Sequence, residues 1–170
     1  MTRTKYHPPA DGGIVMMERT DSRPLYMIRG HLHRRGMAGE AEVARKVRCP
    51  ECDGRLALLK KKNTPLFDLE CTGCKFKAQV KTVWERPRNW VTGAGWRPME
   101  EWLNDPKHKV PPLIVNFKWD SGQQILFYPD IPAGHLKRRV LPENHRNAGH
   151  EMFNYMHLNH LRCITLFYRS

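Results

Sequence analysis

Four of the five cysteines stand in two tight pairs, and their spacing restricts the fold more than any other feature of the chain. Cys49 and Cys52 form the first pair, and Cys71 and Cys74 form the second, with 18 residues between the pairs. Each Cys-x-x-Cys turn can supply two thiolates to a tetrahedral zinc ion, and this spacing is typical of a zinc ribbon. Four thiolates leave no open coordination position. The pattern therefore predicts a structural zinc site within 49–74, with any catalysis carried by other residues.

The remaining sequence indicates a protein of a reducing, intracellular compartment. Cys163 lies far from the two pairs, so the cysteines do not form a disulfide framework, and we expect Cys163 to be a small buried residue. The first residues, MTRTKYHPPADGG, contain no apolar stretch of the secretory type. No apolar run approaches the roughly 20 residues that cross a bilayer. We therefore expect a cytoplasmic protein without a membrane contact.

The charge balance favours a polyanionic partner. The 170 residues include 29 Lys and Arg against 17 Asp and Glu, which gives a net charge of +12. Nucleic acid is the commonest partner for such a chain, and the sequence leaves DNA and RNA both open. The basic residues that we expect to contact phosphates are Lys60, Lys61, Lys62, Lys75, Lys77, Arg138 and Arg139.

Residues 1–30 are rich in Pro, Gly and Arg and show little periodicity, which predicts a basic N-terminal arm with a short strand near 25–28. Hydrophobic periodicity predicts one α/β domain at 31–170. Within that domain we expect a helix at 31–47, a loop at 84–95, a short helix at 98–103 and a weaker third helix within 150–158. The expected strands are 55–60, 66–70, 76–83, 112–117, 124–128 and 163–168.

The strand at 76–83 carries the residues that suggest catalysis. Side chains alternate across a strand, so Gln79 and Lys81 share one face. If 66–70 pairs with 76–81 as an antiparallel hairpin, Asp68 comes to lie beside them. The Asp68 carboxylate, the Gln79 amide oxygen and the Val80 backbone carbonyl are hard ligands suited to Mg²⁺ or Mn²⁺. Lys81 could then orient a water molecule for attack on a phosphodiester.

The segment resembles the PD-(D/E)xK nuclease superfamily, and within it the DpnI-like restriction endonucleases that carry a four-cysteine zinc site. The residues that carry the resemblance are the Cys-Pro-Glu-Cys knuckle, Asn63-x-Pro65, Asp68, Gln79-Val80-Lys81 and, more weakly, 111–116, 138–142 and 147–149. The resemblance implies a mixed sheet flanked by helices with an inserted zinc ribbon, and a Mg²⁺-dependent DNA endonuclease. It also gives Asp68 and Lys81 the catalytic roles and puts Gln79 in the position of the second acidic residue.

Gln79 departs from the acidic residue at that position, which removes a negative charge from the metal site. Glu40, Glu42 and Glu70 are candidates for a compensating carboxylate, or are simply solvated. An alternative function is a non-catalytic zinc-ribbon protein that binds nucleic acid within a larger assembly.

Two further interpretations of the sequence stay open. The histidines near the C-terminus allow an HNH-type metal site, at His145, His150, His157 and His160. Trp90 or Trp96 either stacks on a base or packs within the protein. The sequence does not distinguish a homodimer from a larger assembly.

Overall fold

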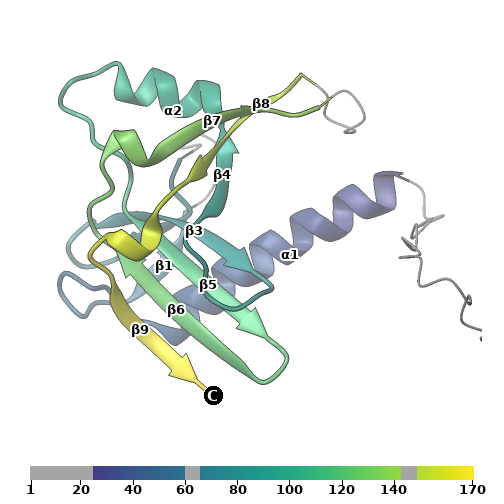
Figure 1. The fold of residues 1–170 in the computed structure, drawn as a ribbon. Coiled ribbons are helices and arrows are strands. Elements are labelled where there is room, and N and C mark those ends of the chain that lie inside the picture. The colour runs from purple at the N-terminus through teal and green to yellow at the C-terminus, as the bar shows by residue number, and fades with distance from the viewer. Residues whose placement is uncertain (1–24, 60–65, 143–148) are drawn as a thin grey trace, which may run out of the picture.

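Two helices and two β-sheets make up the part of the chain that the computed structural model describes, residues 25–59, 66–142 and 149–170, with side chains from residue 36 onward (Figure 1). In chain order the elements are α1 (Leu25–Lys46), β1 (Leu56–Leu58), β2 (Leu69–Cys71), β3 (Lys77–Val83), β4 (Val91–Gly95), α2 (Trp96–Leu103), β5 (Leu113–Trp119), β6 (Gly122–Tyr128), β7 (Leu136–Val140), β8 (Glu151–Tyr155) and β9 (Ile164–Arg169). Short 3₁₀ turns occupy Ala133–His135 and Leu158–His160.

The larger sheet is mixed, with strand order β1-β2-β3-β5-β6-β9. β1, β2 and β3 form an antiparallel meander, and β3 then pairs with β5 in parallel. A parallel pair needs a crossover connection, which β4 and α2 supply here. β5, β6 and β9 complete the sheet with antiparallel pairs. The smaller sheet has the order β4-β8-β7 and is antiparallel throughout.

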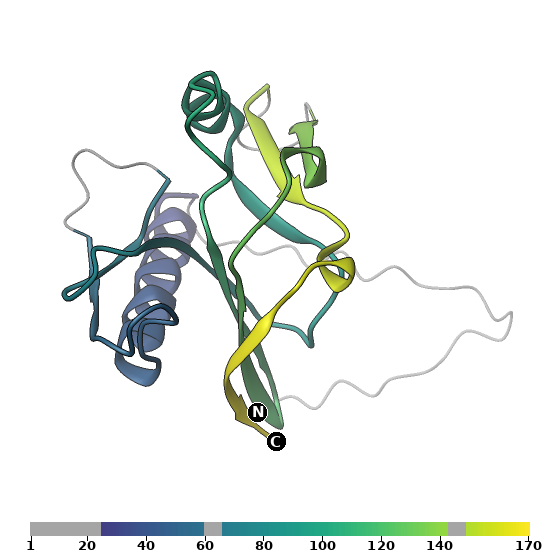
Figure 2. The same cartoon turned by 90° about the vertical axis from the view of Figure 1, so that its left-hand side faces the viewer.

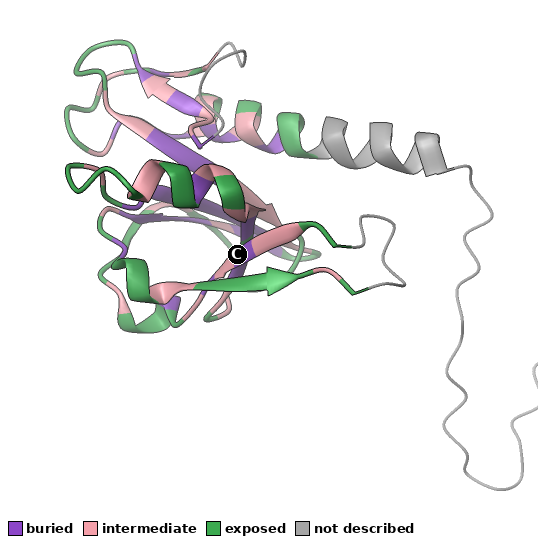
Figure 3. Cartoon of the chain, turned by 90° about the horizontal axis from the view of Figure 1, so that it is seen from above, coloured by how far each residue is buried: buried purple, intermediate pink, exposed green. Residues whose placement is uncertain are grey.

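The larger sheet separates two hydrophobic clusters, because successive side chains of a strand point to opposite faces. On one face, Ala78 and Val80 of β3 pack with Val43 and Val47 of α1. On the other face, residues of β5 and β6 pack against α2 and the smaller sheet. Figure 2 shows α1 on one side of the larger sheet and the smaller sheet with α2 on the other. In Figure 3 the buried positions concentrate in the strands between these layers, while β7 is exposed along most of its length.

A glycine allows α1 to lie close to β3. A Cβ atom added at Gly39 would be 2.1 Å from the Thr82 Oγ1 atom, which is shorter than any normal contact. Any larger residue at 39 would therefore push the helix away from the sheet. A Cβ atom added at Gly36, one turn earlier on α1, would have no neighbouring atom within 4 Å.

Most of the predicted elements are confirmed with small changes in their ends. The helix after residue 31, the helix near 98–103 and the six expected strands all exist. α1 begins at Leu25, so the strand expected near 25–28 is wrong. Residues 1–24, the remainder of the expected arm, lie outside the described residues.

The smaller sheet was not expected. The loop predicted at 84–95 contains β4, the helix predicted within 150–158 is strand β8, and β7 was missed. Phe153 and Tyr155 alternate with more polar neighbours and are both fully buried, which is the period-two pattern of a half-buried strand. Pairing with β4 on one side and β7 on the other makes this segment a strand.

Candidate metal and catalytic sites

The four paired cysteines converge at the tip of the β2–β3 hairpin. Their Sγ atoms all lie within 4.8 Å of one another, and two pairs are closer, Cys49 to Cys74 at 3.6 Å and Cys52 to Cys71 at 3.5 Å. A tetrahedron with metal–sulfur distances of about 2.3 Å has sulfur–sulfur edges of about 3.8 Å. The cluster therefore fits a zinc ion, and it is the only group of this kind among the described residues.

The backbone of each knuckle is held by main-chain hydrogen bonds. Asp53 N donates to Cys49 O at 2.9 Å, and Cys71 N donates to Phe76 O at 2.7 Å. The left-handed conformations that these turns need occur at Asp53 and Lys75, with φ of 57° and 66°, not at the glycines. Gly54 has a different role: a Cβ there would lie 3.0 Å from Cys71 Sγ, so the glycine makes room for the sulfurs.

The protein environment lowers the pKa of one thiol, that of Cys71, which favours the thiolate form that binds metal. Backbone N–H groups of Cys74 and Gly73 lower the pKa of Cys71 to about 6, against the opposing effect of burial. Burial raises the pKa of Cys49 to about 12. A bound cation favours thiolates strongly, so metal binding would release protons from this cluster.

Asp68 lies immediately before β2 and reaches the middle of β3. Its backbone N–H donates to Ala78 O at 3.0 Å, and Ala78 is also the register partner of the next residue, Leu69. Its carboxylate accepts a hydrogen bond from Val80 N at 2.8 Å. The expected hairpin is therefore present in the structure, and it puts the Asp68 carboxylate beside Val80.

The Val80 carbonyl points toward the same edge. The N–H and C=O groups of one strand residue point to the same neighbouring strand. Since Val80 N–H is directed at Asp68, the Val80 carbonyl also faces the Asp68 side of β3. The Val80 side chain belongs to the α1-facing cluster, so Gln79 and Lys81 share the opposite face.

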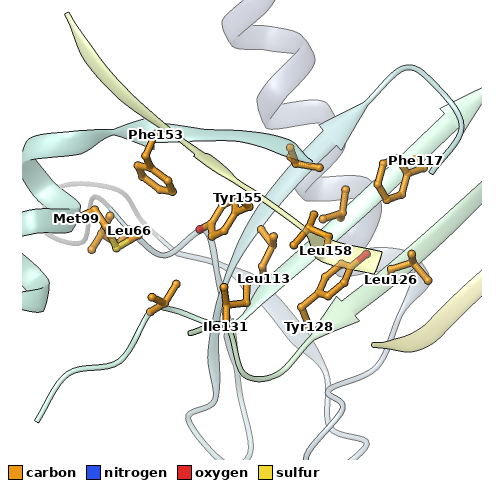
Figure 4. Close-up of a cluster of buried hydrophobic side chains, with 13 residues drawn as sticks. Leu66, Met99, Leu113, Phe117, Leu126, Tyr128, Ile131, Phe153, Tyr155 and Leu158 are labelled. Atoms are coloured by element: carbon orange, nitrogen blue, oxygen red, sulfur yellow. The ribbon is translucent and has the colours of Figure 1, made fainter. Parts of the chain in front are cut away.

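Gln79 is held by a residue that the sequence did not suggest. The Tyr155 hydroxyl donates to Gln79 Oε1 at 2.5 Å, and the Gln79 side chain is only 2% exposed. Tyr155 comes from β8 of the smaller sheet and lies in the cluster of Figure 4 with Phe153 and Leu113. Burial raises the pKa of Tyr155 well above its usual range, and the nearby Asp68 charge adds to this. The hydroxyl is therefore a hydrogen-bond donor at neutral pH.

Glu42 of α1 does not join this group. Glu42 faces the opposite side of the larger sheet and is bound by Lys46 at 2.8 Å and by Lys118 at 2.9 Å. The amides of Asn116 and Gln123 also donate to its carboxylate. Burial opposes ionisation of Glu42, but the two lysines outweigh it and lower its pKa to about 2.

The other two candidates for a compensating carboxylate also have partners. Glu70 pairs with Lys77 at 3.9 Å, across the first rung of the β2–β3 hairpin. Glu40 also interacts with other residues and is partly buried.

The basic residues that were predicted to contact phosphates lie in different environments. Lys60, Lys61 and Lys62 lie outside the described residues, and Lys75 is exposed at the zinc knuckle. Arg138 forms an ion pair with Glu151, while its neighbour Arg139 lies on the other face of β7.

The remaining predictions concern Cys163, two tryptophans and the histidines near the C-terminus. Cys163 is exposed, so the expectation of a buried residue is wrong. Trp90 and Trp96 are half-buried, and Trp96 packs edge-on against Phe153. His157 lies 6.0 Å from both His135 and His160, measured between ring centroids. His145 is outside the described residues, and the described histidines are not part of a metal-binding cluster.

Comparison with protein-family models and with curated protein sequences finds no match for this chain. Neither of the two described helices combines the length and the apolar character needed to cross a bilayer.

Proposed function

We propose that the protein is a metal-dependent DNA endonuclease of the DpnI-like, PD-(D/E)xK type, with the zinc ribbon supporting the hairpin that carries the catalytic residues. The observation that carries the proposal is the hydrogen bond from Val80 N to the Asp68 carboxylate. It puts the carboxylate beside Val80, which stands between Gln79 and Lys81 in the sequence, and the resemblance implies a catalytic group built from these residues.

The order of the elements supports this assignment. A helix, α1, precedes a three-stranded antiparallel meander, and a crossover containing α2 leads to a strand parallel to β3. The resemblance implies a mixed sheet with helices on its faces. α1 covers one face here, and α2 and the smaller sheet cover the other.

The chemistry at the hairpin suits phosphodiester hydrolysis. Mg²⁺ commonly binds through one or two carboxylates and completes its shell with water and substrate phosphates. Asp68 and the Val80 carbonyl are the ligands that this chain would offer, and the net charge of +12 would attract the polyanionic substrate. When bound, the metal ion stabilises the negative charge that develops on the phosphate. Lys81, on the same strand face as Gln79, would orient the attacking water.

The test is a cleavage assay with Mg²⁺ or Mn²⁺ on methylated, unmethylated, single-stranded and branched DNA and on RNA. We expect cleavage of DNA, and a loss of at least about 100-fold in Asp68→Asn and in Lys81→Met, the range typical of general acid–base and electrostatic groups. Asp120→Asn, an exposed carboxylate in the β5–β6 turn, is the matched control. Zinc content and thermal melting must be unchanged in all three variants. Full activity in Asp68→Asn would contradict the proposal.

One observation favours a second function, a non-catalytic zinc-ribbon protein that binds nucleic acid within a larger assembly. Gln79 is uncharged, buried, and already bound by Tyr155. Such a protein would bind DNA or RNA with an affinity that falls steeply with salt. It would cleave none of these substrates with either metal ion, which distinguishes the two functions.

A further inference from the structure

The outer face of the smaller sheet contains a cavity of about 350 Å³, whose lining includes neither the paired cysteines nor Asp68. Its lining residues are Trp90, Lys137, Arg138, Arg139, Asn154 and Met156. Phe153 and Tyr155 of β8 are fully buried on the inner face, so Asn154 between them points outward. Lys137 of β7 and Thr92 of β4 lie directly opposite Asn154 on its two sides.

Asn154 has an unused hydrogen-bond acceptor. Its Oδ1 atom is shielded from water and has no hydrogen-bond partner among the described residues. A buried polar atom left in this state costs about 1–3 kcal/mol. Such an atom is uncommon in a folded protein, and a ligand N–H group that enters the cavity would satisfy it.

The walls of the cavity combine an aromatic ring with cationic side chains. Trp90 is fixed by Arg88, whose guanidinium lies 3.8 Å from the ring centroid and whose Nε donates to Trp90 O at 3.1 Å. Lys137 and Arg139 are exposed and form no ion pair within the described part of the chain. Arg138 differs from them, because it pairs with Glu151.

We propose that this cavity binds a single unpaired nucleobase that carries an exocyclic amino group, which adenine, cytosine and guanine have and thymine lacks. The amino group would donate to Asn154 Oδ1, after the long Lys137 side chain moves aside, and the base would lie against Trp90 and Met156. Lys137 and Arg139 would contact the adjoining phosphates. In thymine the only Watson–Crick N–H stands between two carbonyl oxygens, which would be repelled by Oδ1. The inference rests on the proposed function only in requiring that the protein binds nucleic acid.

The test measures binding of fluorescently labelled oligo(dC), oligo(dA) and oligo(dT) in buffer without a divalent ion. The wild type should bind oligo(dC) and oligo(dA) about tenfold more tightly than oligo(dT), the effect of one hydrogen bond in a buried site. Asn154→Leu should remove this preference and raise Tm, because it deletes an unpaired buried oxygen. Thr92→Val, on the same sheet face but outside the cavity lining, is the matched control and should keep the preference.

Trp90→Ala should weaken binding of all three oligonucleotides alike, since stacking does not depend on the base. Equal affinity of the wild type for the three, unchanged by Asn154→Leu, would overturn the inference. Asp68→Asn should keep the base preference. A base preference without any cleavage would contradict the nuclease but not the pocket, and cleavage without a preference would contradict the pocket alone.

Discussion

At the scale of the residue, the hydrogen bond between Tyr155 and Gln79 limits what Gln79 could contribute to the proposed Mg²⁺ site. The Gln79 oxygen accepts a hydrogen bond from Tyr155 and is shielded from water, so it contributes a neutral ligand at best. Asp68 would then be the one charged ligand that these residues supply, and divalent metal binding would depend largely on the phosphates of the substrate.

Gln79→Glu should strengthen metal binding and destabilise the metal-free protein. The new carboxyl would be buried beside Asp68, and both effects would raise its pKa. Mg²⁺ would relieve this repulsion, so Tm should rise more with Mg²⁺ than in the wild type. The Mg²⁺ concentration for half-maximal cleavage should fall about tenfold, equivalent to about 1.4 kcal/mol. Gln124→Glu on β6 is the control. A Tm in Gln79→Glu that does not respond to Mg²⁺ would contradict the assignment of this edge as the metal site.

A second prediction at this scale concerns Glu42, whose pKa is about 2 in the folded protein, against an ordinary value of 4.5. A depressed pKa contributes stability that is present above pH 4.5 and is lost as the pH falls toward 2. Glu42→Gln should therefore lower Tm at pH 6 and much less at pH 3. Glu101→Gln removes an exposed carboxylate, bound by Arg97 in the same i,i+4 geometry, and should change Tm little at either pH. Equal losses for the two variants would show that the Lys46 and Lys118 contacts do not stabilise the fold.

At the scale of the element, the contact between α1 and β3 depends on one absent side chain. Gly39 lets the helix backbone approach Thr82, and the same approach leaves Thr82 Oγ1 buried without a hydrogen-bond partner among the described residues. Alanine is the better helix former by about 1 kcal/mol, but overpacking a close contact costs about 1–3 kcal/mol. The steric effect should dominate at 39 and be absent at 36.

Gly39→Ala should therefore destabilise the protein, whereas Gly36→Ala should stabilise it by about 0.5–1 kcal/mol. Both are measured as the free energy of unfolding in urea. Thr82→Ala should rescue Gly39→Ala, because it removes the atom that a Cβ at 39 would meet. If both glycine variants were stabilised alike, the helix would not be held against β3 at this point.

At the scale of the whole molecule, the zinc cluster joins the end of α1, the start of β1 and the β2–β3 turn. β1 and β2 are three residues each and lie at the edge of the sheet, so their own packing is limited. Metal coordination contributes to folding because the ligands are not assembled in the unfolded chain. Without metal, the β2–β3 hairpin that carries Asp68 would lose its fixed tip.

Cys74→Ser should lower zinc content to below one ion per chain and reduce Tm by roughly 10 °C, which corresponds to about 3 kcal/mol for a domain of this size. Cleavage should fall with it, because Asp68 lies three residues from Cys71. Cys163→Ser is the control, since Cys163 is exposed and outside the cluster. Equal zinc content in the two variants would show that the cluster is not the metal site.

The sequence by itself determined the zinc cluster and the hairpin that carries Asp68, Gln79 and Lys81. Both depend on short-range spacing, the two-residue gap in each knuckle and the period of two along β3, which a chain keeps whatever its neighbours are. The class of fold followed from the same local periodicities.

Only the tertiary structure decided what surrounds these residues. The pairing of β4 with β8 and β7 joins segments far apart in the sequence, and their local patterns are too short to specify it. That pairing puts Tyr155 against Gln79 and directs Asn154 into the outer cavity. The packing of α1 likewise put Glu42 against Lys118 of β5, on the opposite face of the sheet. Such contacts depend on which surfaces meet, and the spacing of residues along one strand or helix does not contain that information.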